Sequence, residues 1–388
     1  MIVRKLLQSA LIIAAGCGLA ACVPAKHPEP DADLPALSTL LGGSANEGFA
    51  VADELRSFQF PADHGPHPEY RNEWWYVTGN LDGNNGRRFG YELTLFRFAL
   101  TPPPAEREAG WRANEVYVGH FAVSDVENDR FLVAEQISRG AADLAGASRN
   151  PVQVWLYDWS LRHRPAAGTA GSWQLRAAAQ DFAIELSLEA LKSPVLQGEK
   201  GLSRKSLDGA NASYYYSMPR LRTTGSLRID DRQFEVNGLS WLDREWSTSA
   251  LGARQVGWDW FALQLDNGNE LMFYQLRRAD GSADEASAGS LIMRDGTRLA
   301  LAHDEVELQA SGSWESPRGG RYPQGWQLRI PSQSIDLRIS PVMADQELDT
   351  FVRYWEGAVD VTGTQGATRV SGRGYVELTG YATAGGAK

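Results

Sequence analysis

The sequence predicts an all-β protein, either a sandwich or a barrel, because three observations favour strands over helices. The chain of 388 residues contains 13 Trp, 13 Tyr and 13 Phe beside 39 Gly, a mixture of large flat side chains and turn formers that is typical of sheets. Short apolar segments are separated by turns that contain Gly, Asn and Asp. No strong apolar stripe with a helical period continues beyond three turns, so long amphipathic helices are not expected.

Individual strands can be placed from local patterns. Over 182–190, Phe182, Ile184, Leu186 and Leu188 alternate with more polar residues, as in a strand with one buried face. Turn residues between apolar segments predict three hairpins, with strands at 72–81 and 87–98, 116–125 and 130–138, and 256–265 and 269–277.

The first and third of these hairpins resemble each other. Trp74-Trp75-Tyr76-Val77 opens one, and Trp258-Asp259-Trp260-Phe261 opens the other about 180 residues later. A repeat of this length indicates a duplicated domain, although hairpins of similar chemistry also arise independently. We therefore divide the body of the chain into domains at 56–235 and 236–388, as its length suggests.

The N-terminal segment is typical of an export signal. Arg4 and Lys5 precede an apolar run that ends in Leu19-Ala20-Ala21-Cys22, which resembles the lipobox of bacterial lipoproteins. The run is shorter than the roughly 20 apolar residues that a membrane-spanning helix needs. We expect residues 1–21 to be a signal peptide and Cys22 to be lipidated after its removal. The alternatives are a secretory signal with an A-x-A cleavage site and a free thiol at Cys22.

Residues 22–55 are predicted to form a flexible linker, since prolines interrupt any apolar period there. Val23, rather than Asp, follows the cysteine, as in lipoproteins sorted to the outer membrane. The protein is therefore expected in the cell envelope, lipid-anchored at the periplasmic face of the outer membrane. Loss of Cys17 with the signal leaves no cysteine pair for a disulfide. A formal net charge of −10 argues against a nucleic-acid partner.

Few motifs indicate a particular chemistry. The G-x-S-x-G elbow, the phosphate-binding G-x-x-x-x-G-K-[ST] loop and the H-E-x-x-H zinc motif are absent from the sequence. His64 and His67 lie close together, where they could bind a metal or form part of an exposed turn. Because Gly65, Pro66 and Pro68 make this segment a loop without predictable geometry, we expect no metal there. We also expect no cofactor.

The segment Trp241-Leu242-Asp243-Arg244-Glu245-Trp246 carries two carboxylates on one face of a predicted strand. Trp241, Asp243 and Glu245 point to one side, and Arg244 and Trp246 point to the other. If the two carboxylates are buried together, the pKa of one rises, and a protonated carboxyl group in an aromatic pocket can act as a general acid. The alternative is a structural ion pair of Asp243 or Glu245 with Arg244, Arg220 or Arg222.

Three other segments carry polar groups on apolar faces. Asp259 shares a strand face with Phe261 and Leu263, so it is either buried and paired or at a rim. His120 faces the same side as Val116, where a structural core histidine is more common than a catalytic base. Tyr214-Tyr215-Tyr216 is expected either at the edge of a pocket or in ordinary strand packing.

Six motifs occur together and in order along the chain. They are Glu73-Trp74-Trp75-Tyr76-Val77-Thr78-Gly79-Asn80-Leu81, Gly119-His120-Phe121, Tyr214-Tyr215-Tyr216-Ser217-Met218-Pro219-Arg220, Trp241-Leu242-Asp243-Arg244-Glu245-Trp246, Gly257-Trp258-Asp259-Trp260-Phe261 and Tyr354-Trp355-Glu356-Gly357. This combination resembles the lipocalin-like family that includes carotenoid 1,2-hydratase (hydroxyneurosporene synthase) and AttH-type secreted proteins. The resemblance extends from about residue 56 to the end of the chain. It implies two consecutive lipocalin-like β-barrels or half-barrels packed together, with an aromatic-lined cavity for a hydrophobic ligand.

The resemblance also implies roles for particular residues. In the hydratase branch of the family, water adds to an unactivated C=C bond without a cofactor. Asp243 is then the acid, and Glu245 or His120 positions or deprotonates the water. Aromatic faces stabilise the cation that protonation creates. The residues expected to contact the ligand are Trp74, Trp75, Tyr215, Trp241, Trp246, Trp258 and Trp260.

Three functions follow from these observations. The first is a membrane-anchored lipoprotein that binds a lipid-like or isoprenoid-like ligand and serves an ABC export system, as AttH-type relatives suggest. The second is a cofactor-independent hydratase or cyclase of an isoprenoid C=C bond with Asp243 as general acid. The third is a hydrolase that uses Asp243 and Glu245 as a carboxylate pair. The lipobox favours the first, because it predicts a location outside the cytoplasm, whereas carotenoids are made at the inner membrane.

Overall fold

The computed structural model describes residues 48–102, 114–167, 170–249, 251–252 and 254–381. The predicted signal peptide, Cys22 and residues 22–47 of the predicted linker lie outside these ranges. All of these described residues belong to one compact unit. No helix among the described residues has both the length and the apolar character needed to span a bilayer.

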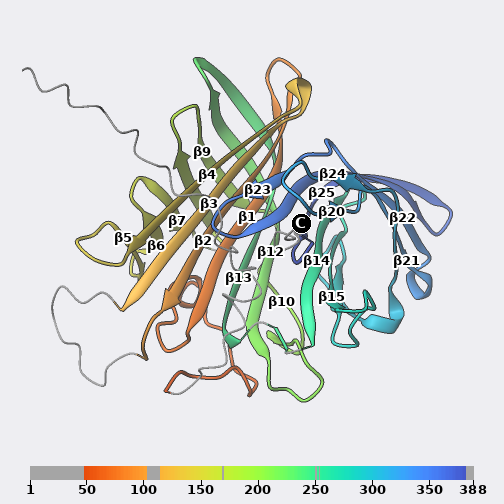
Figure 1. The fold of residues 1–388 in the computed structure, drawn as a ribbon, viewed down its shortest axis with the longest axis horizontal. Coiled ribbons are helices and arrows are strands. Elements are labelled where there is room, and N and C mark those ends of the chain that lie inside the picture. Colours follow the sequence, from red (N-terminus) through yellow and green to blue (C-terminus); the bar gives the residue numbers. More distant parts are fainter. Residues whose placement is uncertain (1–47, 103–113, 168–169, 250, 253, 382–388) are drawn as a thin grey trace, which may run out of the picture. The chain divides into compact units, whose positions relative to one another are not determined.

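The described chain is almost entirely β, as predicted, and its strands form two large antiparallel sheets (Figure 1). The first sheet has 13 strands in the order β4-β3-β2-β1-β13-β12-β9-β8-β7-β6-β5, and both β10 and β11 pair with β12. Its strands are β1 (Asn72–Gly83), β2 (Arg88–Ala99), β3 (Glu115–Asp125), β4 (Arg130–Arg139), β5 (Ala145–Arg149), β6 (Val152–Leu156), β7 (Trp159–Arg164), β8 (Ser172–Ala178), β9 (Phe182–Ala190), β10 (Val195–Leu196), β11 (Leu202–Arg204), β12 (Ala212–Ile229) and β13 (Arg232–Ser249).

The second sheet has 10 strands in the order β17-β16-β15-β14-β25-β24-β22-β21-β18, with β23 paired to β24. Its strands are β14 (Gln255–Leu265), β15 (Glu270–Arg278), β16 (Ala288–Ile292), β17 (Arg298–Ala302), β18 (Glu307–Ala310), β21 (Trp326–Ile330), β22 (Ile335–Pro341), β23 (Glu347–Asp349), β24 (Arg353–Gln365) and β25 (Thr368–Leu378). A separate ribbon pairs β19 (Trp314–Glu315) with β20 (Arg321–Tyr322). The described ranges also contain four 3-10 turns, η1 (Ala62–His64), η2 (Val126–Asn128), η3 (His303–Glu305) and η4 (Pro331–Gln333).

The three predicted hairpins and the predicted strand at 182–190 are confirmed, and the repeated hairpin occupies the same place in both sheets. In the first sheet, β1 pairs with β2 on one side and with the last strand, β13, on the other. In the second sheet, β14 pairs in the same way with β15 and with the last strand, β25. The predicted boundary at 235/236 falls inside the long strand β13, and the two sheets separate between Ser249 and Gln255.

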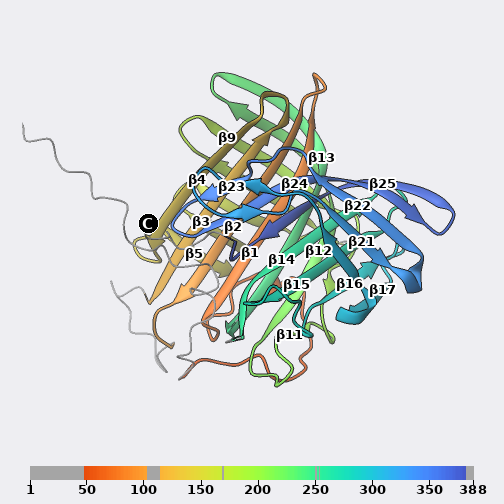
Figure 2. The same cartoon turned by 45° about the vertical axis from the view of Figure 1, so that its right-hand side comes forward.

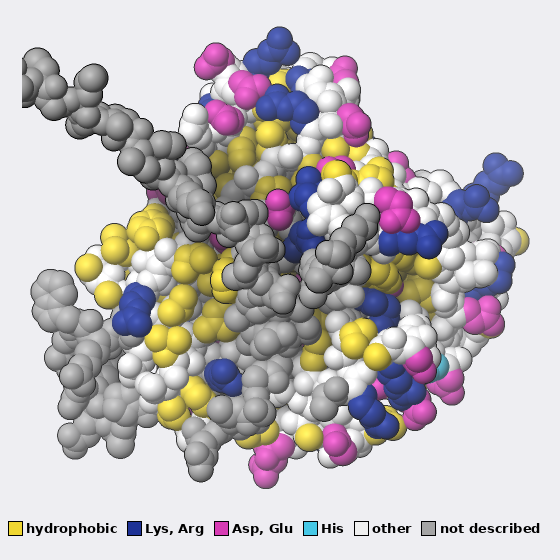
Figure 3. All heavy atoms as spheres, in the orientation of Figure 1, with side chains coloured by type: hydrophobic (Ala, Val, Ile, Leu, Met, Phe, Trp, Pro, Cys, Tyr) yellow, Lys and Arg dark blue, Asp and Glu magenta, His cyan; other side chains and the backbone are white. Residues whose placement is uncertain are grey.

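The first sheet curls into a nearly closed barrel around its own core. At the gap between its edge strands, the Tyr157 hydroxyl, just after β6, donates a hydrogen bond to the Ile137 carbonyl of β4 at 3.3 Å. Hydrophobic side chains gather over this side of the face seen in Figure 3, near β4–β6, while acidic and basic side chains are intermixed elsewhere on that face. Ile137, Leu144 and Tyr157 are all exposed here.

Large side chains fill the interior of this first barrel. Trp75, Trp159, Trp173 and Trp246 are each less than 2 % exposed within its core. An eight-stranded barrel can hold one small ligand only when its interior is left open. In this sheet four indoles occupy that space.

The outward faces of the two sheets pack on each other and form a further core (Figures 1 and 2). Side chains alternate along a strand, so Trp75 and Val77 point into the first barrel while Trp74 and Tyr76 face the second sheet. Hydrogen bonds also cross this interface. The Tyr76 hydroxyl donates to Glu356, and the Asn80 amide donates to the Gly374 carbonyl at 2.9 Å.

Candidate functional site

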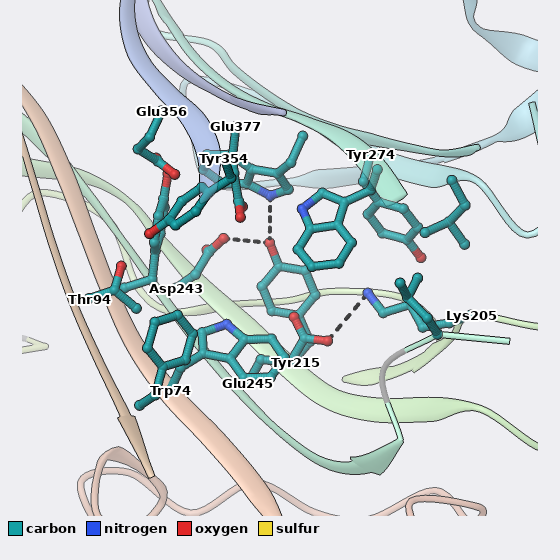
Figure 4. A pocket seen from close by; sticks show the side chains of 16 residues that line it. Trp74, Thr94, Lys205, Tyr215, Asp243, Glu245, Tyr274, Tyr354, Glu356 and Glu377 are labelled. Atoms are coloured by element: carbon teal, nitrogen blue, oxygen red, sulfur yellow. Dashed lines mark hydrogen bonds and ion pairs between the residues drawn. The ribbon is translucent and has the colours of Figure 1, made fainter. Parts of the chain in front are cut away.

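A pocket lies at this interface, and both sheets contribute to it (Figure 4). Its volume is about 80 Å³, several times the roughly 10–15 Å³ that one water needs. Its wall is mainly aromatic, with carboxylates set between the rings. The lining residues are Trp74, Tyr76, Thr94, Phe96, Lys205, Tyr215, Asp243, Glu245, Leu251, Trp258, Trp260, Tyr274, Leu276, Tyr354, Glu356 and Glu377.

On the first sheet, strand register places the lining residues in two neighbouring rows. Glu245 lies opposite Trp74 of β1 on one side and opposite Tyr215 of β12 on the other. In the next row, Asp243 lies between Tyr76 and Ser217. Asp243 and Glu245 share a strand face, as predicted, and both line the pocket.

On the second sheet, one row runs across four adjacent strands. Tyr274 of β15 lies opposite Trp260 of β14, which lies opposite Glu377 of β25, which in turn lies opposite Glu356 of β24. Trp258 stands two residues from Trp260 on the same face. This row faces the carboxylates of β13 across the pocket (Figure 4).

Asp243 is buried and has only neutral hydrogen-bond donors. Ser217 Oγ donates to Oδ1 at 2.5 Å, Trp241 Nε1 donates to Oδ1 at 2.7 Å, and the Tyr215 hydroxyl donates to Oδ2 at 2.5 Å. Burial raises the pKa of Asp243 to about 7, although these hydrogen bonds lower it, and the Glu245 carboxylate adds to the rise. A carboxyl group with such a pKa is protonated in a large fraction of molecules near neutral pH.

The alternative that Asp243 or Glu245 pairs with a nearby arginine is wrong. Arg244 lies on the other face of β13 and binds Glu73 at 3.0 Å, because consecutive residues of a strand point in opposite directions. Arg220 pairs with Glu270, and Arg222 pairs with Glu189 at 3.3 Å. No ion pair to Asp243 occurs among the residues that the structure describes.

Glu245 has a different environment from Asp243. Its Oε1 lies 3.3 Å from Lys205 Nζ and also accepts a hydrogen bond from Ser213. Burial alone would lower the pKa of Lys205, but the Glu245 carboxylate raises it above its ordinary value. The Lys205 ammonium also lies 4.0 Å from the ring centre of Tyr274. The pocket therefore combines a neutral acid with an ion-paired carboxylate, and such differing environments separate the roles of two carboxyl groups.

The pocket contains two more acids, Glu356 and Glu377, that sequence reasoning did not select as site residues. Burial raises the pKa of Glu377 to about 8, a hydrogen bond with Trp258 lowers it, and the Glu245 and Asp243 carboxylates add to the rise. Burial, followed by Glu377 and Glu92, also raises the pKa of Glu356. Strand alternation in Tyr354-Trp355-Glu356-Gly357 indicates that Glu356 points away from the core-facing Trp355, but the facing sheet could not be inferred from it.

The predicted aromatic ligand contacts divide between the two faces of the first sheet. Trp74, Tyr215, Trp258 and Trp260 line the pocket. Trp241 is buried beside the pocket and donates a hydrogen bond to Asp243, so it contacts the acid but does not form part of the pocket wall.

Trp75 and Trp246 lie in the core of the first barrel instead. The Arg244 guanidinium stands 3.8 Å from the ring centre of Trp75. Trp246 stacks on the His67 ring with centroids 3.7 Å apart. Side chains alternate between the two faces of a strand, and both tryptophans lie on the face opposite to the residues that line the pocket.

The candidate histidines are buried and hydrogen-bonded. His120 lies behind the pocket wall, where Nδ1 is 2.7 Å from the hydroxyl of the lining residue Tyr354 and Nε2 is 3.1 Å from Glu135. His64 contacts the Tyr216 hydroxyl at 2.6 Å, and His67 contacts both Asp63 and Glu73. The expected exposed turn at His64 and His67 is therefore wrong, because the η1 segment packs onto the first barrel. The described residues contain no cluster of ligands suited to a metal ion.

Asp259 is buried and paired, one of the two predicted alternatives. Its Oδ1 accepts a hydrogen bond from Arg277 Nε at 2.8 Å, and its Oδ2 accepts one from the Tyr381 hydroxyl at 3.0 Å. Burial raises its pKa, and Arg277 opposes that rise. Asp259 lies on the strand face opposite to Trp258 and Trp260, so it is a structural ion pair of the second sheet.

Comparisons with known proteins agree with this architecture. A crystal structure from Nitrosomonas europaea described as AttH is 34 % identical, covers 86 % of this chain and 100 % of its own, and superposes with a TM-score of 0.76. Kievitone hydratase from Nectria haematococca is 16 % identical, covers 87 % of this chain and 97 % of its own, and has a TM-score of 0.65. CghA with Sch210972 is 11 % identical, covers 89 % of this chain and 99 % of its own, and has a TM-score of 0.53.

At these low identities, kievitone hydratase and CghA show that they share the fold of this chain. A search of curated proteins found no match. The family model described as AttH-like matches residues 51–381, which is nearly all of the described chain. The protein belongs to the AttH-like family.

Proposed function

We propose that the protein is a cofactor-independent acid catalyst, a hydratase or cyclase that acts on a C=C bond of a hydrophobic substrate. The observation that carries this proposal is Asp243, a buried carboxyl group in an aromatic pocket with neutral hydrogen-bond donors and no cationic partner among the described residues. A structural aspartate of a core is expected to be paired with a cation, as Asp259 is with Arg277.

The proposed chemistry begins with a proton transfer. The C=C bond uses its π electrons to form a C–H bond with the proton of Asp243, which leaves a carbocation and an Asp243 carboxylate. Trp74, Trp258 and Trp260 line the pocket, where their rings can stabilise the positive charge. In a hydration, water adds its oxygen to the cation and gives a proton to Glu245, which then returns it to Asp243. In a cyclisation, a second C=C bond captures the cation and a proton is lost from carbon to Asp243.

Two positioning residues support Asp243 in this scheme. Trp241 can only donate a hydrogen bond, so it binds Oδ1 and favours a proton on Oδ2. The Tyr215 oxygen beside Oδ2 also accepts a hydrogen bond from Trp260 Nε1 at 3.2 Å. The acid is therefore fixed between the first sheet and the second, beside the rings of the pocket (Figure 4).

The neighbouring folds support this proposal over simple ligand storage. Kievitone hydratase is named for a hydration, and its fold extends over nearly the same length as that of this chain. The small, partly polar pocket also suits a reacting group better than it suits storage of a whole lipid. An anchor at Cys22, a periplasmic location and an ABC transporter partner are proposals from the sequence alone, and each is compatible with catalysis.

The proposal can be tested in deuterated water with a panel of unsaturated substrates, such as linear carotenoids and kievitone. A hydratase or cyclase product should carry deuterium on carbon, since Asp243 exchanges its proton with solvent before transfer. Asp243→Asn should lower turnover by at least about 100-fold, the usual contribution of a general acid, while substrate binding persists. Unchanged turnover in Asp243→Asn, with product still deuterated, would refute the assignment of the acid.

A further inference from the structure

Glu356 and Glu377 form an unusual pair in the second sheet. They are direct partners on neighbouring antiparallel strands, and both point into the pocket. Two ionised carboxylates placed directly opposite each other in a sheet would repel, so the pair can carry its full charge only when a cation lies beside it. No ion pair to either carboxylate occurs among the described residues, so the described chain supplies no such cation.

One oxygen of this pair has no partner at all in the described structure. Glu356 is completely buried, and only its Oε1 accepts a hydrogen bond, from Tyr76. Its Oε2 is buried without a hydrogen-bond partner. Buried polar atoms in proteins are nearly always hydrogen-bonded, so an orphaned oxygen at a cavity wall indicates a place where a ligand group binds.

Aromatic rings surround these two acids. Trp260 is the cross-strand neighbour of Glu377 in β14, Trp258 is hydrogen-bonded to Glu377, and Tyr354 stands two residues from Glu356. A cation placed over such ring faces is attracted by their negative quadrupoles, most strongly where water is excluded. Carboxylates together with rings therefore form a site for a positive charge.

The other end of the same pocket already shows this chemistry with a cation of the protein. The Lys205 ammonium pairs with Glu245 and lies over the ring of Tyr274. The end formed by Glu356 and Glu377 has the same combination of carboxylates and rings, but the described chain supplies no cation there.

We infer that the pocket binds the ammonium head of a hydrophobic amine between Glu356 and Glu377, with its apolar part against the aromatic wall. This binding site goes beyond the proposed reaction, since it requires no proton transfer by Asp243. It also identifies a class of ligand, namely amines with the shape of the substrate. The ammonium group of such an amine would occupy the position of the carbocation in the proposed reaction.

The site implies a sign for the pH dependence of binding. Bound ammonium stabilises a carboxylate, so a carboxyl group must release its proton when the amine enters, and affinity should increase with pH. The titratable groups that face the site from the surrounding elements all contribute to this pH dependence. They are Tyr76 of β1, Glu92 of β2, Lys205 before β12, Tyr215 of β12, Asp243 and Glu245 of β13, Tyr274 of β15, Tyr354 of β24 and Tyr375 of β25.

Three probes with one alkyl chain test the inference: octylamine, 1-octanol and octanoic acid. Binding can be measured by tryptophan fluorescence and calorimetry of the purified protein. Octylamine should bind at least about tenfold more tightly than 1-octanol near pH 7.5, with proton release and with affinity that rises toward pH 8.5. Equal affinity for octylamine and 1-octanol, or tighter binding of octanoic acid, would overturn the inference.

Matched variants identify the residues responsible. Glu356→Gln and Glu377→Gln should each weaken octylamine by about tenfold and leave 1-octanol unchanged. Glu189→Gln is the control, because this exposed glutamate is not among the residues that line the pocket and pairs with Arg222. Circular dichroism checks the fold of each variant. If one of the two pocket variants does not fold, the octylamine affinity of the other tests the site. Unaltered octylamine affinity in the folded variants would refute the site.

The result is separable from the proposed reaction. Asp243→Asn protein that lacks turnover but still prefers octylamine to 1-octanol would support both proposals. Turnover without any preference for octylamine would refute the amine site and leave acid catalysis standing. A preference for octylamine in a protein without turnover on any substrate would support the amine site alone.

Discussion

Replacement of Asp243 by Asn should make the folded protein more stable above neutral pH. A carboxyl group whose folded-state pKa lies above its unfolded value lowers the stability of the fold as pH rises from the unfolded pKa to the folded one. For Asp243 this interval extends from 3.8 to about 7. At about 1.4 kcal/mol for each pH unit, the penalty reaches about 4 kcal/mol and is constant above that range.

The Asn side chain removes this penalty at a modest loss of hydrogen bonding. Its Oδ1 can accept from Ser217 and Trp241, as Asp243 Oδ1 does, but its amide group must donate to Tyr215 instead of accepting. If that change costs about 1 kcal/mol, the net gain above neutral pH is about 3 kcal/mol. Near pH 3 the penalty is almost absent, so the variant should be about 1 kcal/mol less stable than the parent.

Urea unfolding at several pH values measures both quantities, with the free energy of unfolding taken from the linear dependence on denaturant. A crossing of the two stability curves between acid and neutral pH is the expected signature of an acid kept neutral by burial. An Asp243→Asn protein that is less stable at every pH would refute this reasoning, because it would show that Asp243 is a structural carboxylate.

Two further predictions concern the ion pairs on either side of the first sheet. Lys205→Met should destabilise the fold by about 3 kcal/mol in urea unfolding at neutral pH, because it leaves Glu245 buried without its partner, and adding Glu245→Gln should recover most of that loss. A double variant as unstable as the single one would contradict the pairing. Glu73→Gln should cost about 3–5 kcal/mol, because Arg97 and Arg244 both bind this carboxylate in the barrel core. Burial opposes the ionised form of Glu73, but the two arginines keep its pKa well below the ordinary value, so its contribution is present at neutral pH and lost as pH falls. A loss below about 1 kcal/mol, or one that is unchanged in acid, would contradict this account.

The sequence was most informative where structure depends on neighbours along the chain. The turns at Asp82-Gly83 and Asp266-Asn267-Gly268, and the alternation over 182–190, identified strands that the structure contains. Alternation also placed Asp243 and Glu245 on one face and Arg244 on the other. These features follow from the period of two that every strand imposes on its side chains.

The location of the pocket could not be predicted in the same way, because it depends on how two sheets pack. The lipocalin-like resemblance implied an aromatic-lined cavity but did not give its location, and the indoles of Trp75 and Trp246 fill the interior of the first barrel. The alternation of side chains along a strand would have excluded Trp246 from the pocket wall, since Trp246 lies three residues from Asp243 and therefore points to the opposite face. Glu356 and Glu377 are more than 100 residues from β13, so only the packed outward faces bring them to the pocket.

The most direct test of the account is the titration of Asp243 itself. Infrared difference spectra between the parent protein and Asp243→Asn isolate the carbonyl stretch of this one protonated carboxyl group, and the signal can be followed across the pH range. A neutral acid in the pocket should give a protonated band that disappears with a midpoint near pH 7. A band that disappears near the ordinary aspartate pKa of about 4 would contradict a neutral acid in the pocket.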